Sequence, residues 1–169
     1  MPNDVSAPSS FARQEGVSLP LLDSVLPTNQ VHLDALLKQI TSRETRKVGI
    51  LGLAFKSDTD DLRGSPMVAV AETLLGRGYE VSIYDPQINL SRLIGSNERL
   101  ISRRMPHLAN LLKETAGEVL ERSDLIVAAQ RCVPAPELAG MVREEQVVID
   151  VNGWRELEAM DWKYEGFCW

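Results

Sequence analysis

The sequence is poor in the residues that build metal centres and disulfide frameworks. It has two cysteines, Cys132 and Cys168, which lie far apart and outside any CxxC pair, so we expect neither a zinc site nor a disulfide framework. Its two histidines, His32 and His107, occur in unrelated contexts, and we expect ordinary packing or surface roles for them. These shortages predict a protein without a bound metal, folded in a reducing compartment.

Positive charge and long apolar segments are also scarce. Aspartate and glutamate outnumber lysine and arginine by 24 to 18, and no stretch concentrates basic residues without interleaved acidic ones. A nucleic-acid partner is therefore not expected. No run reaches the roughly eighteen apolar residues of a membrane span, and the opening MPNDVSAPSS lacks the basic and apolar regions of a signal peptide. The composition predicts a soluble, cytoplasmic protein with no membrane partner.

The remaining pattern is a long helix followed by alternating strands and helices. Apolar residues in 20–43 recur at mostly helical spacing, although Pro27 predicts a kink or a later start near Asn29. After Arg46, the short apolar runs KVGILGLAF, YEVSIYDP, DLIVAAQ and QVVIDVNGW alternate with helical segments, and residues 87–113 predict a loop with a short helix. The fold predicted is α/β: a Rossmann-like parallel sheet with helices on both faces, preceded by a helical segment.

Parallel sheets bind ligands beyond the carboxyl ends of their strands. Candidate binding residues therefore follow the four predicted strands, and these are Phe55 to Arg63, Asp85, Gln130 with Arg131, and Asp150 to Arg155.

The glycines Gly49 and Gly52 give a GxxG spacing, which falls short of the GxGxxG that places a pyrophosphate on a helix N-terminus. Close packing in the sheet or a tight turn explains them equally well. Asp85 ends the second strand, where a dinucleotide fold binds a ribose hydroxyl, and a turn-forming Asp-Pro pair is the simpler interpretation.

A charged run, FKSDTDDLRGSP, follows the first strand and allows two interpretations. It can be a solvated loop with internal ion pairs. Alternatively, Lys56 and Arg63 can bind phosphate or carboxylate groups of a nucleotide ligand, because an ammonium and a guanidinium suit such anions.

The fifteen residues GLAFKSDTDDLRGSP resemble the signature G-L-x-[FY]-K-x-x-T-D-D-x-R-x-S-P of the UDP-glucose/GDP-mannose dehydrogenase family. In that family the signature opens the C-terminal domain. MPNDVSA resembles the end of the family's catalytic motif, TNQVHLDALL its central helix, and GFCW the ending of its GDP-mannose enzymes. The resemblance covers essentially the whole chain but only the second half of a family enzyme.

The resemblance implies an NAD-dependent oxidoreductase, a nucleotide-sugar 6-dehydrogenase that converts GDP-mannose or UDP-glucose to the uronic acid for polysaccharide biosynthesis. Residues 1–45 would contain the end of the catalytic motif and the central dimerisation helix of a homodimer. Residues 46–169 would form the Rossmann-like domain that binds the nucleotide sugar. NAD would be bound mainly by a domain outside this sequence.

Individual positions carry over from the family motifs. Phe55 and Lys56 match residues that bind the substrate, and Arg63 matches an arginine that reaches the NAD cofactor. Asp4 matches the catalytic aspartate that organises the hydrolytic water, and Asn29 matches a polar position of the central helix.

Two departures weaken the catalytic assignment. The position of the family's nucleophilic cysteine falls just before Met1, and Asn3 stands where the motif has a lysine, although an amide cannot supply the charge that stabilises an oxyanion. We expect the chain to be inactive by itself, whether it is an excised domain, a late-starting reading frame or a degenerate paralogue. A non-catalytic nucleotide-sugar-binding or dimerisation module is the alternative, and a CoA- or nucleotide-binding domain that shares only the fold is a weaker one.

Overall fold

The computed structural model describes residues 2–88, 107–160 and 162–167. Two compact units are present, Met1–Arg43 and Glu44–Trp169, and each is described by itself. Most of the predicted loop at residues 87–113 lies outside the described residues. Within the described ranges, no helix has the length and hydropathy needed to cross a bilayer.

The first unit consists of two helices, α1 (Pro2–Gln14) and α2 (Pro20–Thr41). The sequence predicts a helix that is either kinked at Pro27 or starts near Asn29. The later start is wrong, since α2 begins at Pro20 and continues through Pro27. A proline removes one backbone hydrogen bond, and around this position Thr28 adds a side-chain hydrogen bond to the Ser24 carbonyl at 2.7 Å. The helix therefore tolerates its internal proline.

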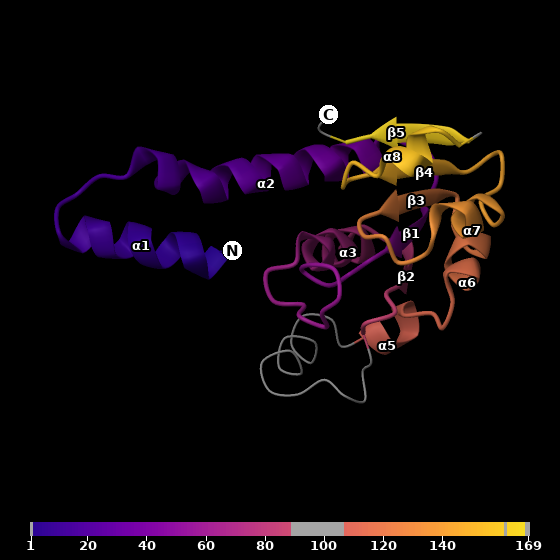
Figure 1. Ribbon diagram of the computed structural model, residues 1–169, viewed down its shortest axis with the longest axis horizontal. Coiled ribbons are helices and arrows are strands. Elements are labelled where there is room, and N and C mark those ends of the chain that lie inside the picture. Colours follow the sequence, from indigo (N-terminus) through magenta and orange to yellow (C-terminus); the bar gives the residue numbers. More distant parts are fainter. Residues whose placement is uncertain (1, 89–106, 161, 168–169) are drawn as a thin grey trace. The chain divides into compact units, whose positions relative to one another are not determined.

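The second unit is built on a five-stranded sheet in the order β2-β1-β3-β4-β5, with every neighbouring pair parallel (Figure 1). Its strands are β1 (Lys47–Leu51), β2 (Glu80–Tyr84), β3 (Leu125–Ala128), β4 (Val147–Asp150) and β5 (Lys163–Gly166). The predicted parallel sheet is confirmed. The edge strand β5 is absent from the sequence-based prediction, because its KYEG run is short, polar and only partly buried.

Helices lie on both sides of this sheet, with α3 (Pro66–Gly76) on one side and α6 (Ala116–Glu121) and α7 (Ala135–Ala139) on the other (Figure 1). Two shorter helices are α5 (Leu108–Leu111) and α8 (Arg155–Glu158). The predicted cap holds, since the Ser65 side chain accepts from the Met67 amide and Pro66 takes the first helical position.

Strand β1 lies at the centre of the core, and Gly49 allows α6 to approach it. A Cβ added at Gly49 would lie 2.7 Å from Val119 Cγ1 and 2.8 Å from Ser123 Oγ. Both neighbours are buried. The first glycine of the GxxG pair is therefore needed for sheet packing rather than for a ligand.

We predict that Gly49→Ala lowers the free energy of unfolding by about 1–3 kcal/mol, because the methyl group overpacks the interface between β1 and α6. Gly76→Ala is the control, since nothing lies within 4 Å of a Cβ at this last residue of α3. It should be neutral or slightly stabilising. Urea denaturation of the two variants checks this, and equal stabilities would contradict the packing role of Gly49.

Candidate functional site

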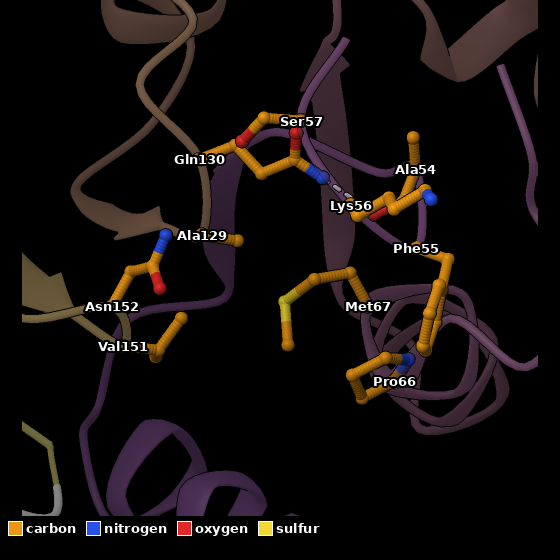
Figure 2. A pocket seen from close by; sticks show the side chains of 10 residues that line it. All are labelled: Ala54, Phe55, Lys56, Ser57, Pro66, Met67, Ala129, Gln130, Val151 and Asn152. Carbon is orange, nitrogen blue, oxygen red and sulfur yellow. Dashed lines mark hydrogen bonds between the residues drawn. The ribbon is translucent and has the colours of Figure 1, made fainter. Parts of the chain in front are cut away.

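A cleft of about 330 Å³ opens where β1, β3 and β4 end at their carboxyl termini (Figure 2). The residues that line it come from the loop after β1, the start of α3 and the turns after β3 and β4. They are Ala54, Phe55, Lys56, Ser57, Pro66, Met67, Ala129, Gln130, Val151 and Asn152. This is the edge of the sheet at which the fold predicts a ligand site.

The backbone of Leu53 and Ala54, directly before Phe55, is held entirely by side chains. Both amides donate to Oδ2 of Asp85, at 2.8 and 2.9 Å. The Leu53 carbonyl accepts from Ser65 Oγ at 2.7 Å, and the Ala54 carbonyl accepts from Gln130 Nε2. Peptide groups that leave a sheet need such partners when they are buried. The loop therefore enters the cleft along a fixed path.

The Asp85 carboxylate accepts hydrogen bonds from three backbone amides. It is buried, and its second oxygen accepts from the Gln87 amide at 3.0 Å. The turn-forming interpretation of Asp85 agrees with these contacts. The alternative, binding of a ribose hydroxyl as in a dinucleotide fold, would have to compete with three backbone amides.

Gly52, the second glycine of the GxxG pair, has φ of +94°, which strongly favours glycine. A Cβ there would lie 2.5 Å from Cβ and 2.6 Å from Cγ of Gln130. Gly52 thus makes room for the Gln130 side chain, a role that the spacing of the glycines alone does not predict.

Further along the loop, Arg63 pairs with Asp61. The guanidinium donates from Nε at 2.8 Å and from Nη2 at 2.7 Å to the two carboxylate oxygens, and the Arg63 amide adds a third bond. The hydrogen bonds from Arg63 lower the pKa of Asp61 to about 2, and Asp61 raises the pKa of Arg63. The Asp61 carbonyl also accepts from the Phe55 amide at 2.7 Å.

The predicted site residues are thus only partly brought together. Phe55 and Lys56 line the cleft, whereas Arg63 is not among the lining residues and its guanidinium faces Asp61. Asp4 lies on α1 of the other unit, and its side chain is outside the described part of the structure. The internal ion pair expected in the charged run is present between Arg63 and Asp61, and Lys56 lies at the cleft.

Asn152, within the candidate range Asp150 to Arg155 that follows the last predicted strand, lines the cleft. The backbone amide of Asn152 donates to Oδ1 of Asp150 at 2.8 Å. The buried Asp150 carboxylate also accepts from the Trp154 backbone amide and the Tyr164 hydroxyl. The sequence predicts this turn as a candidate because it follows a strand end, whereas the contacts of Asp150 are visible only in the structure.

Cys132 does not have the properties of a nucleophile. Burial, and secondarily the charge of Asp85, raises the pKa of the Cys132 thiol to about 12, so the thiolate is disfavoured at neutral pH. Cys168 lies outside the described residues. Within the described ranges, no three His, Cys, Asp or Glu side chains cluster in a way that could bind a metal ion.

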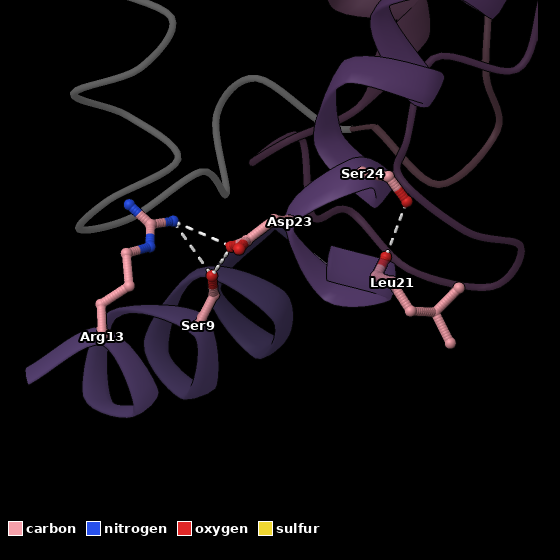
Figure 3. A network of polar contacts seen from close by, with 5 residues as sticks. All are labelled: Ser9, Arg13, Leu21, Asp23 and Ser24. Carbon is pink, nitrogen blue, oxygen red and sulfur yellow. Dashed lines mark hydrogen bonds and ion pairs between the residues drawn. The ribbon is translucent and has the colours of Figure 1, made fainter. Parts of the chain in front are cut away.

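In the first unit, a polar network links the two helices (Figure 3). Ser9 Oγ donates to Oδ1 of Asp23, and Nη2 of Arg13 lies 3.0 Å from both oxygens. The hydrogen bond from Ser9, followed by that from Arg13, lowers the pKa of Asp23. The network ties α1 to the first turn of α2.

The parallel sheet with helices on both sides is a Rossmann-like α/β fold, and the fifteen-residue signature lies in the loop that follows β1. The chain belongs to the UDP-glucose/GDP-mannose dehydrogenase family, because residues 49–164 match the family's UDP binding domain. This confirms the family indicated by the sequence signature.

Individual relatives agree with this assignment. GDP-mannose 6-dehydrogenase of Pseudomonas savastanoi pv. phaseolicola is 36% identical over 170 residues, which cover 100% of this chain and 39% of the relative. UDP-glucose 6-dehydrogenase TuaD of Bacillus subtilis is 36% identical over 89 residues, which cover 50% of this chain and 19% of the relative.

Solved structures show the same likeness. The crystal structure of a ternary complex of GDP-mannose dehydrogenase from Pseudomonas aeruginosa has a TM-score of 0.83 at 35% identity, covering 100% of this chain and 38% of that one. A UDP-glucose dehydrogenase from Pyrobaculum islandicum has a TM-score of 0.73 at 26% identity, covering 99% of this chain and 37% of that one. The chain matches the C-terminal region of the curated relatives and spans about 39% of the length of the GDP-mannose 6-dehydrogenases.

We predict that Asp85→Ala accelerates hydrogen exchange at the Leu53 and Ala54 amides and lowers the free energy of unfolding by about 1–3 kcal/mol, because buried amides lose their acceptor. Asp34→Ala is the control, since Asp34 is exposed on α2 and accepts a surface hydrogen bond from the Gln30 side chain. Unchanged exchange at both amides in Asp85→Ala would show that the loop does not depend on this carboxylate.

Proposed function

We propose that the second unit binds the nucleotide diphosphate part of a nucleotide sugar, GDP-mannose or UDP-glucose, in the cleft beside Lys56. It would do so as the C-terminal part of an NAD-dependent nucleotide-sugar 6-dehydrogenase. The observation that carries the proposal is that Phe55 and Lys56, two fixed positions of the family signature, line a cleft at the strand ends.

The chemistry of the lining supports an anionic ligand with neutral polar groups. Lys56 is the one charged side chain among the ten residues that line the cleft, and no carboxylate is among them. An ammonium in this position suits a diphosphate. Phe55, Pro66 and Met67 supply an apolar surface, while Gln130 and Asn152 supply carboxamides.

The cofactor and catalytic residues belong to the same proposal. Arg63 would contact NAD, which would be bound mainly by another domain. Its guanidinium is more than half exposed and Asp61 fixes its orientation, so an approaching phosphate could reach it. Asp4 would organise the hydrolytic water. A non-catalytic binding module is the second candidate, favoured by Asn3 at the position of the motif's lysine.

We predict that calorimetric titration of the purified chain detects GDP-mannose or UDP-glucose but not NAD, and that no NADH forms when all are mixed. Lys56→Ala should weaken the binding roughly tenfold with little change in thermal stability, because a charge-assisted contact of about 1.5–3 kcal/mol is lost from an exposed loop. Lys47→Ala removes the same charge from the first residue of β1, at the opposite end of the strand, and serves as the control.

The two variants separate the possible results. Equal affinities of Lys56→Ala and Lys47→Ala would remove Lys56 from the site. A parent chain that binds neither nucleotide sugar would contradict the proposed function itself, and NADH formation would contradict the proposed inactivity of the chain alone.

We propose further that the helical unit forms a homodimer contact. Large apolar side chains are exposed on it, including Phe11 at 65%, Leu21 at 81% and Val31 at 67%. Covering them would remove apolar surface from water. Light scattering should give twice the monomer mass at micromolar concentration and a lower mass for Val31→Lys. A monomeric parent chain would contradict the proposal.

A further inference from the structure

Among the residues that line the cleft, Gln130 is fixed by contacts of both its backbone and its side chain. Gln130 follows β3, its amide donates to the Leu51 carbonyl at 2.9 Å, and its carbonyl accepts from the Cys132 amide at 2.8 Å. Its aliphatic stem lies against Gly52, where even a single added carbon would meet it at 2.5 Å. The backbone and stem of Gln130 therefore have little freedom to move.

The carboxamide of Gln130 is oriented by its own hydrogen bond. Nε2 donates to the Ala54 carbonyl, which can only accept, so the nitrogen must face Ala54 and the oxygen must face away from it. Figure 2 shows this arrangement, with the nitrogen directed at Ala54 and the oxygen pointing away. The oxygen Oε1 makes no hydrogen bond to any residue that the structure describes.

An acceptor fixed in this way is ready to bind a donor without rearranging. Lys56, in the same lining, can provide only donors, whereas Gln130 Oε1 provides an oriented acceptor. A nucleotide sugar carries neutral donors in two places, the hydroxyls of its sugars and the N–H groups of its base. A fixed polar group discriminates strongly against ligands that lack its partner.

We propose that Gln130 is a specificity-determining residue of the cleft, whose Oε1 accepts a hydrogen bond from a neutral O–H or N–H donor of the bound nucleotide sugar. This inference rests on the proposed function. It also explains Gly52, because the missing side chain of this glycine leaves the space that the stem of Gln130 occupies.

The test is Gln130→Met, which keeps the length of the side chain and removes both polar atoms. Its affinity for GDP-mannose, GDP, UDP-glucose and UDP should be compared with that of the parent by calorimetry. We expect roughly a tenfold loss for the ligand that the parent binds best, as for one hydrogen bond. A loss restricted to the nucleotide sugars places the donor on the hexose, and a loss shared by the matching diphosphate places it on the base or ribose.

Gln146→Met is the matched control. Gln146 is a buried carboxamide before β4 that donates to the carbonyls of Leu120 and Ser123, and it does not line the cleft. This variant should lose thermal stability but keep its ligand affinity. If Gln130→Met does not fold, Gln130→Ala removes the carboxamide without adding bulk and replaces it in the test.

Hydrogen exchange at the Leu53 and Ala54 amides distinguishes two roles of Gln130, direct contact with the ligand and support of the loop after β1. For Gln130→Met we expect weaker ligand binding with little change in hydrogen exchange at these amides, because Asp85 and Ser65 still hold the loop. Unchanged affinity for every ligand would overturn the proposal, as would a loss accompanied by accelerated exchange at both amides. A parent chain that binds none of the four ligands would instead overturn the proposed function, and this inference with it.

Discussion

The candidate site depends on how the chain is held as it leaves β1. At Leu53 and Ala54 the backbone has passed the end of the sheet, so its amides and carbonyls no longer have strand partners. The side chains of Asp85, Ser65 and Gln130 replace those partners. A buried peptide group without a partner costs about 1–3 kcal/mol, so this set of contacts determines a single path for the loop. Phe55 and Lys56 follow directly and thereby reach the cleft.

The order of the strands explains why these partners are available. β1 lies between β2 and β3, so the residues that follow β2 and β3 flank the loop after β1. Asp85 comes from the first of these neighbours and Gln130 from the second. At the end of β4, Asp150 likewise accepts a hydrogen bond from a backbone amide, that of Asn152, and so fixes the turn that contains Asn152. The carboxylates of Asp85 and Asp150 are buried and accept hydrogen bonds from backbone amides, and neither residue lines the cleft. Lys56 is therefore the charged residue of the lining.

Much of the fold could be predicted from the sequence, and the site only in part. The alternation of apolar runs and helical segments is enough to indicate a parallel sheet, and the fifteen-residue signature is enough to indicate the family. The start of α2 predicted near Asn29, after Pro27, is wrong, because one missing hydrogen bond does not end a helix of 22 residues. β5 escaped prediction because an edge strand needs little apolar patterning.

The roles of single site residues depend on pairings that a linear sequence does not contain. Gly52 requires its positive φ and its glycine identity because of Gln130, 78 positions later, and the two meet only when β1 pairs with β3. Likewise, the Arg63 side chain could bind a ligand or a neighbouring carboxylate, and only the folded loop shows that it pairs with Asp61. Local propensity predicts elements well, whereas tertiary pairing decides what their ends can bind.

The most direct test of the account is to map, by backbone amide NMR, where a nucleotide sugar contacts the isotope-labelled chain. We expect GDP-mannose or UDP-glucose to shift the amides of Phe55, Lys56, Met67, Gln130 and Asn152, which line one cleft in the structure. Shifts confined to the amino ends of the strands, or to the helical unit, would show that the loop fixed by Asp85 does not form the ligand site.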